Sequence, residues 1–163
     1  MKNLTTLFMS GYQLKSVPKE LGQLKNLNTL DLSENRLMSL PKEFGQLKNL
    51  TTLYLDGNQL TSIPKELCRL SNLKILGLSE NRLISIPKEL GHLRNLRHLY
   101  LSENQMTSVP KELSNLKDLE MLTLFGNQLT SVPKELGQLE DLTIDLSGNH
   151  LTSVLKELEQ ELG

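Results

Sequence analysis

The sequence contains a single cysteine, no tryptophan and almost no excess of either sign of charge. One cysteine excludes a disulfide within the chain. The net charge of −1 offers no basic stripe of the kind that reaches phosphates, so a nucleic-acid partner is not expected. The sequence also lacks an apolar run of about 20 residues, so membrane insertion is not expected either. These absences remove two classes of partner and one kind of cross-link.

What the sequence does contain is a repeat of fixed length. Asparagine recurs every 23 residues, and the frame Leu-x-x-Leu-x-Leu-x-x-Asn-x-Leu surrounds each copy. The series consists of Asn35, Asn58, Asn81, Asn104 and Asn127, and the last repeat has its own at Asn149. A period of about 20 to 50 residues indicates stacked repeats. Residues 1–163 are therefore expected to form a single domain of seven repeats, which begin at Leu4, Leu27, Leu50, Leu73, Leu96, Leu119 and Leu142.

Each repeat begins with a short strand and a turn. In the second repeat Leu30 and Leu32 alternate with polar residues, a period of two that predicts a strand whose leucines face inward. Asn35 follows at the bend. Because an asparagine amide both donates and accepts, it can satisfy main-chain groups of its own repeat and of a neighbour. Stacked repeats should thus carry a ladder of asparagines, with Tyr12 in the corresponding place of the first repeat.

The segment that returns the chain to the next strand predicts a short helical turn. A proline such as Pro41 opens it, because the missing N–H costs nothing at the first helical position. Glycine then fits a left-handed position at the end of the turn, at Gly22, Gly45, Gly91 and Gly137. Cys68 and Ser114 occupy this place in two other repeats. Either the main chain is not left-handed there, or each of these two residues costs about 1 kcal/mol.

The end of the chain departs from the frame. Leu155 replaces the proline, and the tail places Leu155, Leu158 and Leu162 at positions i, i+3 and i+7. This spacing is typical of one face of an amphipathic helix. We expect residues 155–163 to form a C-terminal capping helix over the open end of the core, as the terminal unit of a repeat array requires.

The longer frame Leu-x-x-Leu-x-Leu-x-x-Asn-x-Leu-x-x-Ile/Val-Pro-x-x-Leu-x-x-Leu resembles that of the leucine-rich repeat superfamily over the full chain. The phrase from Leu60 to Leu67 is most similar to bacterial members with 23-residue repeats, abundant in pathogenic leptospires, although eukaryotic Ras-binding relatives share the period. The resemblance implies an α/β solenoid: a horseshoe with a parallel β-sheet on its concave face and short helical turns on its convex side. It also implies a protein-binding scaffold, since members of the superfamily are mainly such scaffolds.

The exposed face of the strands carries most of the aromatic residues. Tyr54 and Tyr100 flank Gly77 on neighbouring strands, so their rings should stand roughly 10 Å apart across a gap with no side chain. Such a notch suits the flat anchors of a protein interface, whereas the plainer alternative is aromatic packing between strands. The residues expected to bind a partner are Tyr54, Gly77, Tyr100, His98, Met121 and Phe125, with Asp31 and Asp56 as the polar side.

No group of residues has the spacing of a catalytic or metal site. The sequence has no Cys/His pattern for zinc, no phosphate-binding loop and no Gly-x-Ser-x-Gly elbow. The histidines fall at unrelated positions in the frame, at His92, His98 and His150. We therefore expect no enzyme activity, no metal and no cofactor. Cys68, on the convex side, is interpreted as a tolerated small residue, with an intermolecular disulfide as the alternative.

Together these features predict a non-enzymatic protein-binding module that engages a partner protein through its concave sheet. The resemblance implies a secreted or surface bacterial protein that contacts host cell-surface or matrix proteins. The alternative is an intracellular, cytoplasmic scaffold or a self-associating structural protein. Residues 1–10 already follow the frame, so we interpret them as structure rather than as a signal peptide. The unpaired edge of the first strand and its apolar surroundings leave two alternatives: further residues precede it in a longer chain, or two copies meet there as a weak homodimer through the N-terminal end.

Overall fold

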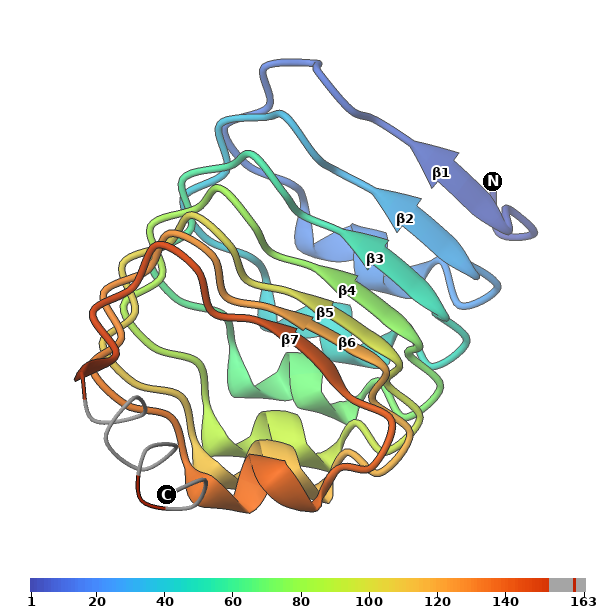
Figure 1. Cartoon of the computed structure of the whole chain (residues 1–163). Coiled ribbons are helices and arrows are strands. Elements are labelled where there is room, and N and C mark those ends of the chain that lie inside the picture. The colour runs from blue at the N-terminus through green and yellow to red at the C-terminus, as the bar shows by residue number, and fades with distance from the viewer. Residues whose placement is uncertain (153–159, 161–163) are drawn as a thin grey trace.

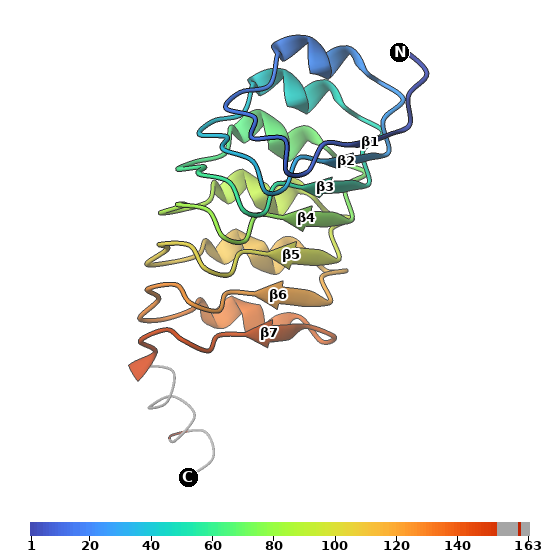
Figure 2. The same cartoon turned by 90° about the horizontal axis from the view of Figure 1, so that it is seen from above.

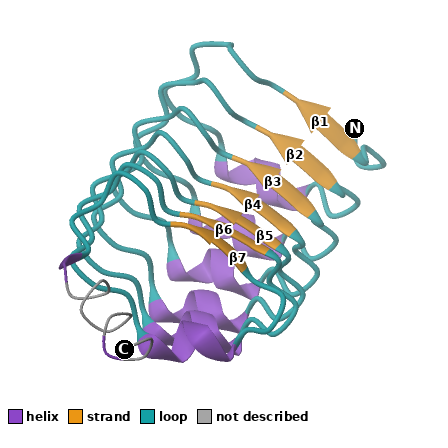
Figure 3. Ribbon diagram, in the orientation of Figure 1, coloured by secondary structure: helices purple, strands orange, loops and turns teal. Residues whose placement is uncertain are grey.

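The computed structural model describes residues 1–152 and residue 160. Within them, seven parallel strands form one sheet in the order β1 to β7, and a 3-10 helix follows each of the first six strands (Figures 1 and 3). The strands are β1 (Thr6–Phe8), β2 (Thr29–Asp31), β3 (Thr52–Tyr54), β4 (Ile75–Gly77), β5 (His98–Tyr100), β6 (Met121–Thr123) and β7 (Thr143–Asp145). The helices are η1 (Lys19–Gln23), η2 (Lys42–Gln46), η3 (Lys65–Arg69), η4 (Lys88–His92), η5 (Lys111–Asn115) and η6 (Lys134–Gln138). The predicted fold class is confirmed.

Each strand pairs with the residues one repeat earlier in the sequence. Leu30 lies opposite Leu7, and the same offset of 23 residues holds for every pair up to β6. In the last repeat Thr143 pairs with Met121, so the chain is one residue shorter immediately before β7. The predicted strand centres, from Leu7 to Ile144, are all confirmed. Seen from above, the strands stack on one side of the array and the helical turns on the other (Figure 2).

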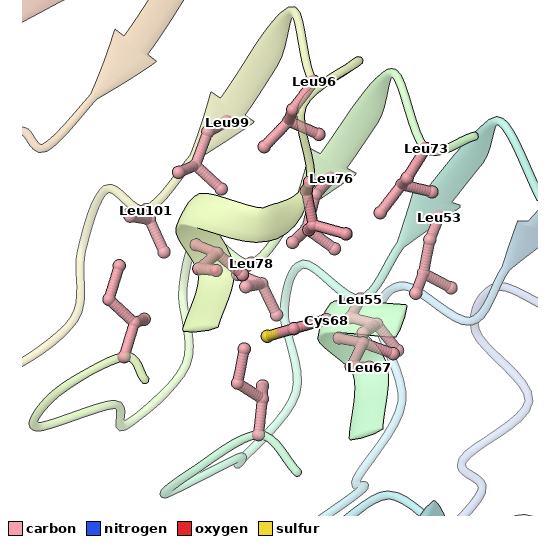
Figure 4. Close-up of a cluster of buried hydrophobic side chains, with 14 of the residues drawn as sticks. Leu53, Leu55, Leu67, Cys68, Leu73, Leu76, Leu78, Leu96, Leu99 and Leu101 are labelled. Carbon is pink, nitrogen blue, oxygen red and sulfur yellow. The ribbon is translucent and has the colours of Figure 1, made fainter. Parts of the chain in front are cut away.

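The leucines of the frame fill the space between the sheet and the helical turns. They point into this space from the strands because side chains alternate along a strand. Figure 4 shows the middle repeats, in which Leu53, Leu76 and Leu99 come from strands and Leu67 from a turn. All four side chains are fully buried. The opposite side of the sheet carries the remaining strand residues, and we call it the concave face.

The predicted ladder of asparagines is confirmed. In a typical copy, the Asn81 Nδ2 donates hydrogen bonds to the carbonyl oxygens of Leu55 (3.0 Å) and Leu78 (3.1 Å). Its Oδ1 accepts a hydrogen bond from the Leu60 N–H at 3.0 Å. Leu55 and Leu60 belong to the preceding repeat, so the asparagine joins two repeats. The whole series from Asn35 to Asn127 is at most 7% exposed, which makes these hydrogen bonds part of the core.

A second ladder of asparagines, which was not predicted from the repeat frame, runs along the loops that lead into the strands. Each of its members donates an Nδ2 hydrogen bond of 2.8–3.1 Å to a carbonyl oxygen 24 residues earlier, and the members are Asn26, Asn49, Asn72 and Asn95. These side chains are exposed, so each bond replaces one to water and contributes less than a buried bond. The signal for this ladder was a second asparagine directly before the first leucine of the repeat.

Three of the four glycines of the convex turns serve close packing, and the predicted left-handed position is wrong for all four. Positive φ angles are absent from the four predicted residues, which are Gly22, Gly45, Gly91 and Gly137. A Cβ added to Gly45 would lie 2.5 Å from the main-chain oxygen of Glu66 in the next turn, and Gly91 faces Glu112 in the same way. The proline is also displaced by one residue: Pro41 is extended (φ −65°, ψ 140°) and precedes the first helical residue.

Cys68 and Ser114 occupy the position of the helical turn that glycine holds in the other repeats, which we call the glycine slot. They keep their neighbouring turns further apart. Helix η3 packs less closely against η4, and η5 against η6, than the turns that have glycine in this slot. The first of the two alternatives is therefore correct, because neither residue is left-handed.

The Cys68 side chain lies among leucines of the core (Figure 4), and burial raises the pKa of its thiol to about 12. A buried, protonated thiol reacts poorly, which favours the tolerated-residue interpretation over a disulfide.

The left-handed position of the repeat lies instead in the turn after each strand. Glycine occupies it in four repeats, at Gly11, Gly57, Gly126 and Gly148. Glutamate occupies it in the other three, at Glu34, Glu80 and Glu103, with φ between 54° and 56°. A side chain in this conformation is strained by roughly 1–2 kcal/mol, which the surrounding hydrogen bonds of the turn must offset.

Replacing Glu80 with glycine is expected to raise the free energy of unfolding by up to about 1 kcal/mol, since glycine removes the strain but loses part of the gain to its flexible unfolded state. The change also removes a carboxylate that repels Asp56. Arg82→Gly is the control, because Arg82 lies in the same loop without a positive φ. It should lower stability by up to about 1 kcal/mol. Denaturant unfolding measures both variants, and equal losses would contradict strain at Glu80.

Among residues 1–152 and 160, no helix is long and apolar enough to cross a membrane. The predicted capping helix of residues 155–163 lies outside the described residues, apart from Gln160. The capping helix and the single domain of residues 1–163 therefore stay predictions.

Candidate functional site

One row of side chains crosses the concave face at the last residue of every strand. Pairing in register sets side by side Phe8, Asp31, Tyr54, Gly77, Tyr100, Thr123 and Asp145. Tyr54 thus lies between Asp31 and Gly77, and Tyr100 lies on the far side of Gly77. Both tyrosines are half-buried. The constant repeat length therefore brings the two rings to either side of the glycine.

The space above Gly77 holds a carboxylate, so the predicted gap with no side chain is wrong. A Cβ added to Gly77 would clash with Asp56 Oδ1. Asp56 Oδ2 accepts a hydrogen bond from the Ser79 N–H at 3.1 Å, which holds the side chain across the boundary between two repeats. Gly77 itself is buried. We call the group of Tyr54, Asp56, Gly77 and Tyr100 the tyrosine notch, and its floor is acidic rather than empty.

Two groups of the tyrosine notch hold their protons more tightly than usual. Burial raises the pKa of the Asp56 carboxyl, hydrogen bonds from main-chain N–H groups lower it, and the nearby carboxylates of Asp31 and Glu80 raise it again. Burial also raises the pKa of Tyr54, with further contributions from Tyr100 and the two aspartates. Tyr54 is therefore a neutral hydroxyl at physiological pH, able both to donate and to accept a hydrogen bond.

A second row, which contains the predicted residues His98 and Met121, lies at the first position of the strands. Ile75, His98 and Met121 are neighbours in register on β4, β5 and β6. The His98 ring lies beside the Tyr100 ring, with centroids 6.1 Å apart and planes tilted by 50°. His98 Nε2 is 3.5 Å from Glu120 Oε2, the one ion pair found in the described part of the chain when the histidine is protonated. His98 thus connects the second row to the tyrosine notch.

Two predicted residues lie at the margins of this site. The Phe125 side chain is 41% exposed, and its ring leans over the last turn, where its Cε2 would lie 3.3 Å from a Cβ at Gly148. The ring is therefore directed toward the end of the array and does not join the tyrosine notch. Asp31 borders the notch, but its Oδ1 already accepts a hydrogen bond from the Ser33 N–H at 2.9 Å.

The tyrosine notch offers groups for recognition. It combines two aromatic faces, two hydroxyls and a carboxylate on a sheet whose inner side is packed with leucine. Within the described residues, no group of three His, Cys, Asp or Glu side chains could hold a metal ion. Every buried side-chain nitrogen or oxygen of this part of the chain has a hydrogen-bond partner. Tyrosines on a rigid scaffold suit contact with a protein, because few torsions are lost on binding.

Comparison with known proteins identifies a family and several similar structures. The leucine rich repeat family matches residues 2–60, 48–106 and 71–129. A leucine-rich repeat protein of Leptospira interrogans is 35% identical, with a TM-score of 0.72, over 91% of this chain and 50% of its own. The ectodomain of the plant membrane receptor kinase GASSHO1/SCHENGEN3 of Arabidopsis thaliana, in complex with Casparian strip integrity factor 2, is 37% identical. Its TM-score is 0.83, over 91% of this chain and 19% of its own.

A more distant likeness concerns the fold alone. An internalin of Listeria monocytogenes is 24% identical, with a TM-score of 0.69, over 80% of this chain and 38% of its own. No curated protein matches the sequence significantly. The chain spans half of the leptospiral protein and a smaller share of the other two, so these likenesses describe the repeat array and not a whole relative.

Proposed function

Because the chain belongs to the leucine-rich repeat family, we propose that it is a non-enzymatic module that binds a partner protein through its concave face. The observation that carries the proposal is the tyrosine notch. Aromatic residues make up 4% of the chain and leucine fills the core, yet two tyrosines stand on the concave face. Rings in this place do not serve the core, and they present flat anchors of the type that dominates interface energies.

The residues of the face take distinct parts in this proposal. Tyr54 and Tyr100 are the anchors, and Asp56 accepts a hydrogen bond or a positive charge from a partner group that enters between them. Gly77 leaves room for that carboxylate. The remaining contacts come from the rest of the predicted set, Asp31, His98, Met121 and Phe125, of which Phe125 lies furthest toward the end of the array.

We propose further that the module is secreted or displayed on a bacterial surface and that its partner is a host cell-surface or matrix protein. Likeness to the leptospiral protein supports a bacterial setting. Likeness to a plant receptor ectodomain in complex with a factor supports the use of such an array in recognition. A cytoplasmic scaffold stays the alternative, and finding the protein inside the cell rather than in the medium or on the surface would favour it.

The binding proposal can be tested with immobilised protein and a panel of purified host matrix and plasma proteins. Wild type should retain at least one of them. Tyr54→Ala and Tyr100→Ala should each weaken that binding by about 1–3 kcal/mol, or about 5- to 150-fold in Kd, because each removes an anchor. The matched control is Lys88→Ala/Lys111→Ala, which removes two exposed side chains of the convex turns and should bind as wild type does.

Circular dichroism first establishes that the variants are folded. If a panel protein binds the tyrosine variants as tightly as wild type, the binding site lies outside the concave face. Retention of no panel protein would contradict the proposed class of partner.

A further inference from the structure

The N-terminal end of the solenoid leaves an apolar hollow uncovered. The hollow has a volume of about 610 Å³, and its walls include Leu4, Leu7, Met9, Leu14, Leu21 and Leu24. One repeat later the same frame positions are closed, since Leu27, Leu30 and Leu32 are fully buried. Phe8 and Tyr12 stand at the rim, and each is 66% exposed. This end therefore shows the core of the array in cross-section.

The main chain of β1 is also open at this end. Strand β1 is an edge of the sheet. The Thr5 carbonyl oxygen accepts a hydrogen bond from the second repeat, and the Met9 N–H donates one to it. Groups of successive residues point to opposite sides of a strand, so the N–H and C=O of Thr6 and Phe8 point away from β2. Such a row of free donors and acceptors is a template for another strand.

We propose that two copies of the chain meet head to head at this end, with their β1 strands antiparallel about a two-fold axis at Leu7. Thr6 of one copy then lies opposite Phe8 of the other, and the two residues exchange both of their outward hydrogen bonds. The two Leu7 side chains meet on the core side of the sheet. Each Phe8 ring covers the other copy's Thr6 on the concave face. The interface is self-complementary, as a two-fold contact requires.

The charge of the surface favours a second copy as the occupant. Glu20 is the only charged side chain among the residues that line the hollow. A surface that is nearly neutral can face its own copy without the repulsion that a charged patch would cause. A strongly charged partner would find at most one complementary group there, the Glu20 carboxylate.

The residue at position 12 argues against a further repeat of the same kind as the occupant. The ladder asparagine of each later repeat serves the repeat before it, as Asn35 does by accepting hydrogen bonds from the N–H groups of Tyr12 and Leu14. Tyr12 stands at the ladder position of the first repeat and has no amide. A repeat stacked on this end would therefore lose the buried hydrogen bonds that hold all the other repeats together.

The area at this end predicts a weak dimer. Two aromatic side chains that are two-thirds exposed, together with the half-buried aliphatic side chains of the hollow, offer roughly 500 Å² in each copy. Two copies would bury roughly 1,000 Å² in total, which is below the range of about 1,200–2,000 Å² for a stable complex and is typical of weak contacts. We therefore expect a dissociation constant on the order of 0.1–1 mM.

Sedimentation equilibrium of the wild-type chain, from about 10 µM to 1 mM, tests the proposal directly. Wild type should shift reversibly from monomer to dimer. Phe8→Lys should raise the dissociation constant at least about tenfold, because it places a charge in the contact. Ile84→Lys is the matched control: Ile84 is an apolar side chain, 59% exposed, far from this end, and its replacement should leave the association unchanged.

The register is tested by cross-linking in a Cys68→Ala background, which removes the native thiol. A mixture of Thr6→Cys and Phe8→Cys chains should form a disulfide-linked dimer, since residues that face each other as a hydrogen-bonded pair have Cα atoms about 5.5 Å apart. Either variant alone should cross-link at least about tenfold more slowly, because Thr6 does not face Thr6 and Phe8 does not face Phe8.

A wild-type chain that stays monomeric at the highest concentration would overturn the proposal, as would a dimer that Phe8→Lys does not weaken. Cross-linking that is as fast for one variant alone as for the mixture would overturn the two-fold axis at Leu7. The interface lies at the end of the array, apart from the tyrosine notch, so the binding of a host protein and this self-association can each fail without the other.

Discussion

Replacing Asn81 with alanine is expected to lower the free energy of unfolding by about 3–5 kcal/mol. The substitution leaves the Leu60 N–H without its partner. The carbonyl oxygens of Leu55 and Leu78 each lose one of two amide donors, since Asn58 and Asn104 also donate to them. These groups lie in the core, where the unsatisfied N–H costs about 1–3 kcal/mol and each of the two lost hydrogen bonds about 1 kcal/mol. Because Leu55 and Leu60 belong to the preceding repeat, the loss should weaken the coupling between two repeats and reduce the cooperativity of unfolding.

The matched control is Asn72→Ala. Asn72 lies in the loop before β4, the strand that Asn81 follows. Its side chain makes a single exposed hydrogen bond of 2.9 Å to the carbonyl oxygen of Lys48. Water replaces that bond when the side chain is removed, so a loss below about 1 kcal/mol is expected. Urea unfolding followed by circular dichroism compares the two variants. Similar losses for both would show that the buried ladder contributes no more than the exposed one.

Replacing Gly45 with alanine is expected to destabilise the fold by about 2–3 kcal/mol. The added Cβ would lie 2.5 Å from the main-chain oxygen of Glu66. Since the obstacle is main chain rather than the end of a flexible side chain, the neighbouring turn has to move and the packing beneath it is disturbed. Thermal or denaturant unfolding measures the loss.

Gly137→Ala is the matched control for this prediction. Gly137 holds the same slot in the last helical turn, has no positive φ, and would place its Cβ where no atom lies within 4 Å. Alanine there should be neutral or stabilising by up to about 1 kcal/mol, because it restricts the unfolded chain. Equal destabilisation at both glycines would mean that the main-chain conformation, and not the close approach of the next turn, explains the glycine.

Most of the fold could be predicted because two periods in the sequence act independently. The alternation of Leu30 and Leu32 with polar residues places a strand and its inward face. The constant repeat length then fixes which residues become neighbours, and so placed Tyr54 and Tyr100 on either side of Gly77. The role of Asn81 followed from the chemistry of its amide, which can serve two repeats at once.

The features that could not be predicted depend on distances between repeats. Glycine suits both a left-handed main chain and a close approach, and the residue type alone does not separate them. For Gly45 the distance to Glu66 decides the matter. Asp56 belongs to a different row of the frame from Gly77, so its carboxylate was not expected above the glycine. The Asp56 side chain fills the space that the absent side chain of Gly77 leaves free. The repeat period does not encode the direction in which such a side chain turns.

The slot held by Gly45, Cys68 and Ser114 has a consequence for the shape of the array as a whole. Strands of the sheet stand about 4.8 Å apart because hydrogen bonds fix their spacing. The convex turns are spaced by side-chain packing, so the residue in the slot sets how far apart they stand. Wider spacing there means a smaller radius of curvature, and Cys68 therefore bends the solenoid between β3 and β4 where glycine would straighten it. The tyrosine notch spans those strands, so in the proposed interface one small residue on the opposite side of the molecule would set the width of the partner that the concave face accepts.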